Sequence, residues 1–218
     1  MYSKYIKRIL DIILSVMIFP IVLLASIIII PCIWIEDRGT PFYNAPRLGR
    51  YGKFFTMYKF RSMYRNAPDI RNADGTTYNS DGDGRVTRIG KIIRKTSLDE
   101  LPQILNVLKG NMSLVGPRPD LPDALNAFIG DEEKKLDVRP GITGYSQAYH
   151  RNNIELHERF REDVYYAEHV SFMLDVKIVL KTIDSVLLRR NVYRNTMSST
   201  HDETAIGSEE GYYENNKC

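Results

Sequence analysis

Residues 12–35 contain no charged side chain, and this run of 24 positions constrains the fold more than any other feature of the sequence. A helix needs about 20 apolar residues to cross the hydrocarbon core of a bilayer. A cleaved signal peptide is the alternative, because Lys4, Lys7 and Arg8 precede the run. The run is longer than the roughly 7–15 apolar residues of such a peptide, and no small-residue cleavage motif ends it. It therefore predicts a retained membrane helix.

Two features of this segment bear on its path through the membrane. Pro20 lies within it, and a proline inside a helix removes a backbone donor and bends the helix. Cations lie on both sides of the run, and cations favour the cytoplasmic face. They are Lys4, Lys7 and Arg8 before it and Arg38, Arg47, Arg50 and Lys53 after it.

A straight crossing would place one of these two clusters of cations on the outer side of the membrane. We therefore predict a re-entrant helix-break-helix over residues 1–37, bent near Pro20, with a single crossing as the alternative. Asp11 is then expected near the headgroups, because a charge in hydrocarbon is costly.

The charge of the chain is unevenly distributed. Residues 195–218 hold five acids against one lysine and carry −4, so the remainder of this +3 chain carries +7. A basic body is compatible with phosphates, anionic lipids or nucleic acid as partners. Residues 191–218 are polar and patternless, which predicts a disordered tail. Cys32 and Cys218 are the only cysteines, which suggests neither a disulfide framework nor a cysteine zinc site.

The sequence predicts an α+β catalytic domain over residues 38–190 with short strands. Residues 42–63 are expected to be extended, with Lys59 and Arg61 on one face because side chains alternate along a strand. The Gly- and Asp-rich residues 66–87 predict a loop. The Pro- and Gly-rich segments 113–119 and 138–144 predict constrained loops without regular structure.

Helices are expected in the rest of this domain. Ser97 and Glu100 have the spacing of a capping box, and they precede a helical apolar pattern that ends at Gly110. Further helices are predicted over 122–137, 154–168 and 172–188. The last is amphipathic, so it can pack on the core or lie at the bilayer surface as an interfacial helix.

Asp99 and Glu100 are the strongest candidates for chemistry. Acids in the first turn of a helix often only complement its dipole, but this pair lies among cations and two Gly/Pro-rich loops that each carry an arginine. Arginine binds phosphate oxygens with fixed bidentate geometry. These cations are Arg88, Lys91, Arg94, Lys95, Arg118 and Arg139.

Two neighbouring carboxylates can divide the work of phosphate transfer. One attacks phosphorus and forms a reactive acyl phosphate. The other holds a divalent ion, since magnesium binds one or two carboxylates together with substrate phosphates. The ion is needed because a carboxylate and a diphosphate repel each other.

Four motifs resemble the bacterial sugar transferases, the monotopic polyprenyl-phosphate phosphoglycosyltransferases, in their small single-domain form. The similarity runs from about residue 4 to residue 190 and keeps the order of the family. The motifs are Tyr58-Lys-Phe-Arg-Ser-Met63, Thr96-Ser-Leu-Asp-Glu-Leu-Pro-Gln103, Asn106-Val-Leu-Lys-Gly-Asn-Met-Ser-Leu-Val-Gly-Pro-Arg-Pro119 and Val138-Arg-Pro-Gly-Ile-Thr-Gly-Tyr-Ser-Gln147.

The resemblance implies an enzyme that moves a sugar 1-phosphate from a UDP-sugar to a polyprenyl phosphate in a ping-pong reaction with Mg²⁺ or Mn²⁺. By motif, Asp99 is similar to the nucleophile and Glu100 to the metal-associated carboxylate of the family. The other matched positions are Lys59, Arg61, Arg94, Arg118 and Arg139 near phosphates and Gln147 near the substrate.

The same resemblance implies a bacterial inner membrane protein with its catalytic domain on the cytoplasmic face, and paired copies are plausible. Small members often carry Ser-Pro at the helix break. Here Phe19 precedes Pro20, and Ser15 is the hydroxyl that could satisfy a carbonyl at the bend.

Two other classes of function fit parts of the sequence. A nucleic-acid-binding protein could use the basic body, but the cations lie in tight loops beside carboxylates and lack an interleaved aromatic platform. A non-catalytic membrane scaffold could use the apolar N-terminus and the amphipathic C-terminal helix. That class predicts no effect of magnesium or of conservative carboxylate changes, so the enzyme is the preferred interpretation.

Overall fold

The structure is a computed structural model that describes residues 1–72, 77–80, 82–150 and 153–187. The predicted disordered tail over 191–218 lies outside the described residues. The described part has the mixed helix-and-sheet composition that the sequence predicted.

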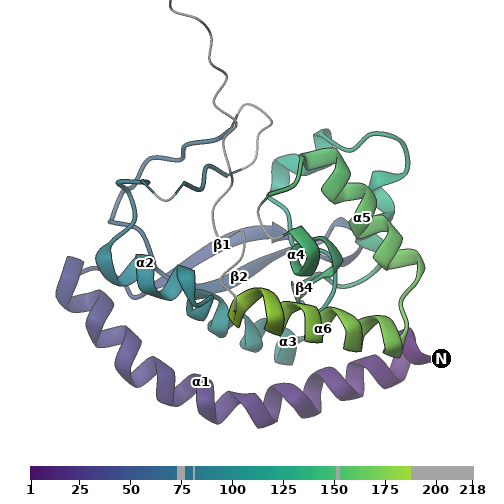
Figure 1. Cartoon of the computed structure of the whole chain (residues 1–218), viewed down its shortest axis with the longest axis horizontal. Helices are drawn as coiled ribbons and strands as arrows, with labels where there is room; N and C mark the ends of the chain where they lie inside the picture. The colour runs from purple at the N-terminus through teal and green to yellow at the C-terminus, as the bar shows by residue number, and fades with distance from the viewer. Residues whose placement is uncertain (73–76, 81, 151–152, 188–218) are drawn as a thin grey trace, which may run out of the picture.

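A long N-terminal helix curves along one side of the molecule (Figure 1). A π-helical turn, η1 (Tyr2–Ile6), leads into α1 (Lys7–Asp37), which stays helical through Pro20 and Pro31. The predicted break at Pro20 is therefore not present, because a proline removes only one hydrogen bond and a bowed helix accommodates that loss. Ser15 does not satisfy a carbonyl there. Its hydroxyl is buried and has no hydrogen-bond partner among the described residues.

The outward face of α1 is strongly apolar. An 18-residue window within Tyr2–Asp37 has a mean hydropathy of 3.0, and only 17% of that window is buried in the protein. By length and composition the helix can cross a membrane. Its most exposed side chains include Met17, Ile21, Leu24, Ile27 and Ile28.

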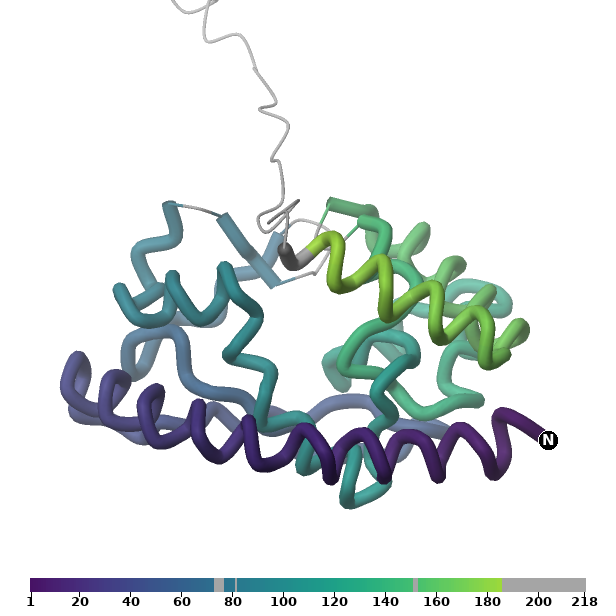
Figure 2. Tube along the Cα trace, turned by 60° about the horizontal axis from the view of Figure 1, so that its bottom comes forward, coloured from purple at the N-terminus to yellow at the C-terminus, as the bar shows by residue number. Residues whose placement is uncertain are grey.

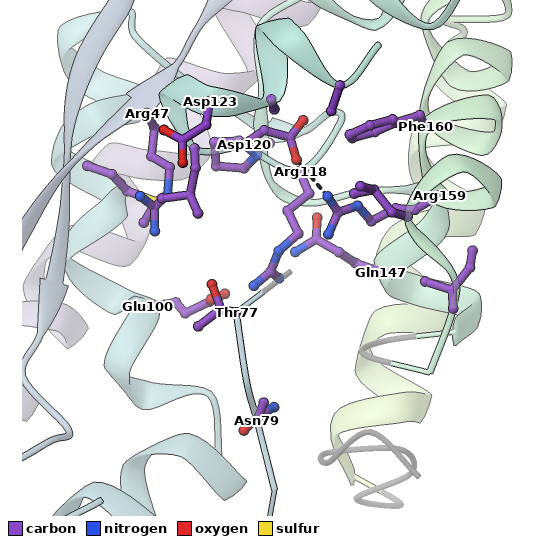
Figure 3. A pocket seen from close by; sticks show the side chains of 18 of the residues that line it. Arg47, Thr77, Asn79, Glu100, Arg118, Asp120, Asp123, Gln147, Arg159 and Phe160 are labelled. Atoms are coloured by element: carbon purple, nitrogen blue, oxygen red, sulfur yellow. Dashed lines mark hydrogen bonds and ion pairs between the residues drawn. The ribbon is translucent and has the colours of Figure 1, made fainter. Parts of the chain in front are cut away.

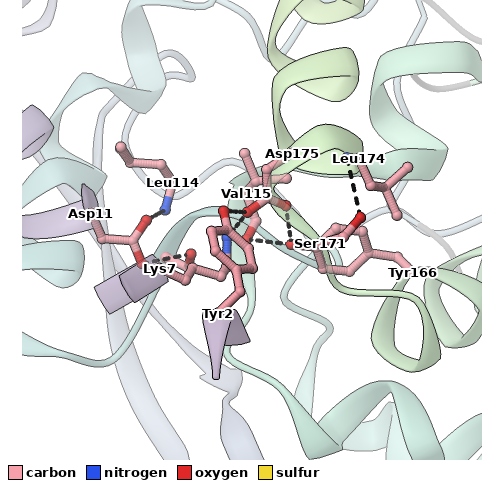
Figure 4. A network of polar contacts seen from close by, with 10 residues as sticks. Tyr2, Lys7, Asp11, Leu114, Val115, Tyr166, Ser171, Leu174 and Asp175 are labelled. Atoms are coloured by element: carbon pink, nitrogen blue, oxygen red, sulfur yellow. Dashed lines mark hydrogen bonds and ion pairs between the residues drawn. The ribbon is translucent and has the colours of Figure 1, made fainter. Parts of the chain in front are cut away.

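The N-terminal end of α1 is bonded to the folded body that follows it in the chain (Figure 4). Lys7 Nζ lies 2.7 Å from Asp175 Oδ2. The buried Asp11 carboxylate accepts hydrogen bonds from Ser113 Oγ (2.8 Å) and from the Leu114 backbone N–H (3.0 Å). The domain itself therefore supplies the partners of Asp11, and its place near the headgroups stays a prediction.

The C-terminal end of α1 is bonded to the same domain. The Glu36 carboxylate accepts from the backbone N–H groups of Arg88 (2.7 Å) and Ile89 (3.0 Å), which begin α2. Asp37 Oδ2 pairs with Arg61 NH1 at 3.1 Å. Both ends of the apolar helix thus contact one folded body, as Figure 2 also shows.

An antiparallel hairpin forms the first sheet. Strands β1 (Phe42–Leu48) and β2 (Phe54–Phe60) pair from Phe42↔Phe60 to Leu48↔Phe54 around the turn η2 (Arg50–Gly52). This confirms the extended segment. The alternation of β2 buries Phe55 and Met57, which pack with Val107 and Met112 in one core cluster.

The segment with the candidate carboxylates is less regular than predicted. After α2 (Arg88–Lys95), which the sequence did not predict, come the 3₁₀ helix η3 (Leu98–Gln103) and α3 (Ile104–Lys109). Gly110 ends α3 at φ 89°, as predicted. The predicted capping box is absent. Ser97 has φ 58° and makes no capping bond, whereas a capping residue needs extended backbone.

Two loops that were expected to be irregular pair as a short parallel sheet. Strands β3 (Ser113–Val115) and β4 (Gly141–Thr143) are joined further by the Gly116 N–H to Thr143 O bond (2.8 Å) and the Gly141 N–H to Pro117 O bond (2.9 Å). A Cβ at Gly116 would lie 2.3 Å from Arg139 O, and one at Gly141 2.1 Å from Gly116 N. The glycines are therefore required by this close backbone approach.

The C-terminal half is helical. The predicted helix over 122–137 is instead two 3₁₀ stretches, η4 (Pro122–Asn126) and η5 (Gly130–Asp137), because Gly130 turns the chain at φ 60°. After the short α4 (Tyr145–His150), α5 (Leu156–Glu168) and α6 (Phe172–Leu187) confirm the last two predicted helices. Helix α6 buries Ile178 and exposes Phe172, Met173, Leu180 and Ile183. Contact of α6 with a bilayer stays a prediction.

Candidate active site

One cavity of about 390 Å³ lies between the hairpin, η3 and the helices α4 and α5 (Figure 3). Its wall includes Lys59 from β2, Glu100 from η3, Arg118 from the loop after β3 and Gln147 from α4. These four residues are separated by up to 88 positions in the chain, and the sequence predicted all of them as site residues. The fold brings them around one space.

Lys59 and Glu100 form an ion pair at the cavity wall. Lys59 Nζ lies 2.6 Å from Glu100 Oε1, and both side chains are largely shielded from solvent, with exposures of 18% and 23%. Strand alternation places Lys59 on the same face as the cavity residue Met57. The Lys59–Glu100 ion pair therefore adds a cation and a carboxylate to the wall of the cavity that Arg118 also lines.

Asp99 lies beside this pair, although it is not among the described residues that line the cavity. In a 3₁₀ helix successive side chains point about 120° apart, so Asp99 and Glu100 face different directions. Burial raises the pKa of Asp99 to about 6; Lys59 opposes the shift and Glu100 adds to it. The carboxyl is thus ionised at neutral pH in a partly buried position.

Three predicted phosphate ligands lie outside the cavity. Arg94 donates from Nε to Ser62 Oγ at 2.8 Å, but its charge still acts on Asp99 and lowers the pKa of that carboxyl. Arg61 is buried and its NH1 pairs with Asp37 at the end of α1, so its side chain does not line this cavity. It follows the last residue of β2, where the strand period no longer applies.

Arg139 also lies away from the cavity. It donates from Nε to Gly110 O at 2.9 Å, at the C-terminal end of α3. Burial lowers its pKa, and the neighbouring cations Arg8 and Arg50 lower it further. In the fold, Arg139 therefore binds a carbonyl at the C-terminal end of a helix, where a cation is favourable.

Sequence reasoning missed a buried network of charges behind the cavity. Lys135 Nζ lies 2.6 Å from both Asp120 Oδ2 and Asp163 Oδ2. Asp120 and Arg159 line the cavity, and Arg159 NH2 lies 2.8 Å from Asp120 Oδ1. In the sequence Arg159 belongs to a charged helix that has the pattern of a solvated face. The spacing of these residues in the sequence does not indicate that they form a network.

Asp99 and Glu100 are the two carboxylates of this site that would hold a magnesium ion shared with a substrate. Within the described ranges, no group of three or more His, Cys, Asp or Glu side chains can hold a metal ion. Asp99 and Glu100 offer two carboxylates, and magnesium commonly takes one or two carboxylates and completes its shell with phosphate oxygens and water. Manganese accepts the same oxygen ligands.

The sequence profile of the bacterial sugar transferases matches residues 2–189. The chain belongs to the bacterial sugar transferase family. The four motifs that carried the resemblance lie within this match, and they contribute every cavity residue that the sequence predicted.

Named relatives share much of this sequence. The undecaprenyl-phosphate galactose phosphotransferase of Salmonella typhimurium is 38% identical over 205 residues, which cover 88% of this chain and 42% of that protein. A UDP-N-acetylgalactosamine-undecaprenyl-phosphate N-acetylgalactosaminephosphotransferase of Aeromonas hydrophila is 38% identical over 84% of this chain and 44% of that protein. The chain therefore spans less than half the length of these two relatives.

A relative of similar size is also found. The exopolysaccharide production protein ExoY of Sinorhizobium fredii is 35% identical over 86% of this chain and 88% of its own length. The first two relatives name undecaprenyl phosphate with two different sugars, and ExoY names exopolysaccharide production. Membership of the sugar transferase family is what this chain shares with all three.

Proposed function

We propose that this chain transfers a sugar 1-phosphate from a UDP-sugar to a polyprenyl phosphate and releases UMP, as the first membrane step of a bacterial glycan. The single observation that carries the proposal is the site. The Lys59–Glu100 ion pair and Arg118 lie at one cavity, and Asp99, whose pKa burial raises to about 6, lies beside that pair. The names of the relatives support the same substrates.

The reaction proceeds in two displacements at one phosphorus atom. A carboxylate oxygen of Asp99 forms a bond to the β-phosphorus of the donor, and the bond from that phosphorus to the oxygen bridging it to the α-phosphorus breaks. UMP leaves with that electron pair. A phosphate oxygen of the polyprenyl phosphate then attacks the same phosphorus, the acyl–oxygen bond to phosphorus breaks, and Asp99 returns as a carboxylate.

The side chains at the cavity stabilise charge, and none of them has to transfer a proton. Arg118 and Lys59 stabilise negative charge on the phosphoryl oxygens, as fixed cations do in a site sheltered from water. Glu100 and Asp99 would hold magnesium, which when bound offsets the repulsion between carboxylate and diphosphate. Lys59 keeps Asp99 ionised by opposing the effect of its burial.

The covalent step predicts a mass increase on the protein. The purified chain in detergent, incubated with magnesium and a panel of UDP-sugars but no acceptor, should gain one phosphosugar in intact-mass spectra. Peptide mapping should place it on Asp99, and polyprenyl phosphate should remove it. An unmodified protein under conditions where product forms readily would rule out the covalent scheme. Loss of the signal in Asp99→Asn is the matched control.

We also propose that α1 enters the cytoplasmic leaflet and that both of its ends remain on the cytoplasmic side. Asp11 and Glu36 lie at opposite ends of the apolar helix, and both bond to the same domain. If α1 crossed the membrane, about 30 Å of hydrocarbon would separate its two ends. Both ends could then not bond to the same domain. The bowed helix keeps both sets of bonds and leaves its apolar outer face to lipid.

Labelling from one side of the membrane tests this path. In a chain with Cys32→Ser and Cys218→Ser, single cysteines are introduced as Ser3→Cys and Lys53→Cys, with Lys134→Cys reporting the side of the catalytic domain. All three positions are exposed. An impermeant maleimide should label all three only in inside-out vesicles. Labelling of position 3 from the opposite side to position 134 would establish a crossing instead.

A further inference from the structure

We propose that Arg8, Arg50 and Arg139 bind the phosphate group of an anionic phospholipid beside the N-terminal end of α1. We call these three residues the lipid-phosphate site. It is distinct from the cavity, because none of the three lines the cavity wall. The inference goes beyond the transfer reaction and rests on one part of the proposed function, the position of α1 in the cytoplasmic leaflet.

The C-terminal end of α3 brings two of these arginines together. Arg8 donates from NH1 to Val107 O at 2.7 Å and from NH2 to Leu108 O at 3.2 Å. Arg139 donates from Nε to Gly110 O at 2.9 Å, and a Cβ placed on Gly110 would lie 3.5 Å from Arg8 NH2. Both guanidinium groups therefore lie next to Gly110, so two positive charges meet at the end of one short helix.

Arg50 adds a third positive charge from the turn of the hairpin. Its Nε donates to Asp137 O at 2.8 Å, two residues before Arg139. Burial lowers the pKa of Arg139, and the charges of Arg8 and Arg50 lower it further, so the three like charges act on one another. Asp11 opposes this shift, but its carboxylate already accepts two hydrogen bonds from β3.

The positive charge of the lipid-phosphate site is not balanced within the described protein. A helix end offers at most about half of a negative charge, and among the described residues no carboxylate forms an ion pair with any of the three guanidinium groups. The NH1 and NH2 groups of Arg50 and Arg139 have no acceptor among these residues, and they are not buried, so a ligand can reach them. Guanidinium N–H groups match phosphate oxygens in both geometry and charge. The site is therefore complementary to a phosphate group.

The surroundings of the site favour a phospholipid as the source of that phosphate. Arg8 is the second residue of α1, and the exposed side chains of Ile9 and Ile12 follow it within about one turn. The guanidinium carbon of Arg50 lies 4.5 Å from the centre of the exposed ring of Tyr51. Cations beside tyrosine and apolar side chains are typical of the headgroup region of a membrane. The acceptor must bring its phosphate to the cavity, whereas a phospholipid can place its phosphate on these arginines and its acyl chains along the apolar face of α1.

Native mass spectrometry of the full chain in a non-ionic detergent can count the lipids that stay bound. The chain is titrated with phosphatidylglycerol, which is anionic, and in parallel with phosphatidylcholine, which has no net charge. The wild type should bind one phosphatidylglycerol in preference to phosphatidylcholine. Arg50→Gln should weaken this binding about fivefold, and Arg50→Gln combined with Arg139→Gln about 25-fold, the scale on which each arginine attracts an anionic lipid. Arg50→Lys keeps the charge and should stay within about twofold of the wild type.

Other anions and a matched variant separate the possible sources of the phosphate. Arg161→Gln removes an exposed cation from α5 and should not change the affinity for phosphatidylglycerol. Three results would overturn the proposal: equal affinities of the wild type and Arg50→Gln, competition by inorganic phosphate at the concentrations at which phosphatidylglycerol binds, or variants that lose binding of undecaprenyl phosphate but keep that of phosphatidylglycerol. UMP release by the wild-type chain is measured in the same detergent. Its absence would refute the proposed reaction without bearing on the lipid-phosphate site.

Discussion

Replacing Asp99 with asparagine is expected to lower the turnover number at least about 10³-fold, the scale on which loss of a covalent nucleophile acts. Asparagine keeps the shape of the side chain but removes the negative oxygen that attacks phosphorus. The measurement is UMP release from a UDP-sugar in the presence of undecaprenyl phosphate. Near-normal turnover by this variant would remove Asp99 from the chemistry.

The pKa of Asp99 provides a control for this variant. The folded pKa, about 6, lies above the usual value for an unfolded chain of ~3.9. The folded state therefore binds this proton more tightly than the unfolded state, and the stability that protonation provides is lost as the pH rises through about 6. At pH 7.5 the ionised carboxylate lowers the stability of the folded state, and the neutral side chain of asparagine does not. Asp99→Asn should therefore unfold no earlier than the wild type, so its inactivity cannot be attributed to unfolding.

Replacing Lys135 with methionine is expected to destabilise the folded chain by about 3–5 kcal/mol, because it leaves two buried carboxylates without their shared cation. Lys135 is 2% exposed and contacts Asp120 and Asp163, which are also buried. Methionine fills most of the lysine volume, so the loss is electrostatic. Thermal unfolding in detergent should show a midpoint lower by roughly 10 °C.

The neighbouring lysine is the matched control for this change. Lys134 is exposed and its ion pairs with Asp131 and Glu168 lie at the surface, so Lys134→Met should change stability by no more than ~0.5 kcal/mol. Adding Asp163→Asn to Lys135→Met should recover part of the loss, because it removes the carboxylate that loses its cation, whereas Asp120 still pairs with Arg159. Equal midpoints for the two lysine variants would show that the buried network carries no such energy.

The sequence predicted those parts of the fold that local patterns determine. The apolar periodicity of 172–188 and the charged helical pattern of 154–168 predicted α6 and α5 close to their observed bounds. Gly110 ends α3 where its freedom of φ is needed. The motifs that carry Lys59, Glu100 and Arg118 meet at one cavity, and each of them supplies one part of its wall; the roles of these residues stay predictions.

Other parts depend on contacts that no local pattern encodes. Strands β3 and β4 are only three residues long and exist because segments 28 positions apart pair with each other. Arg61 has the residue type of a phosphate ligand, but the end of α1 lies next to it and Asp37 binds it. Arg159 belongs to a charged helix that resembles a solvated surface until Asp120 is placed against it.

The close backbone approach of Gly116 to Gly141 has a consequence for how the enzyme can adapt to different donors. It joins the loop that carries Arg118 to the segment that leads into Gln147, so neither residue can shift without the other. A larger or smaller substrate must then be accommodated on the opposite wall, where Thr77 and Asn79 border the cavity. Divergence among relatives that handle different sugars should accordingly concentrate in side chains and lengths on that wall, while the spacing from Arg118 to Gln147 stays constant.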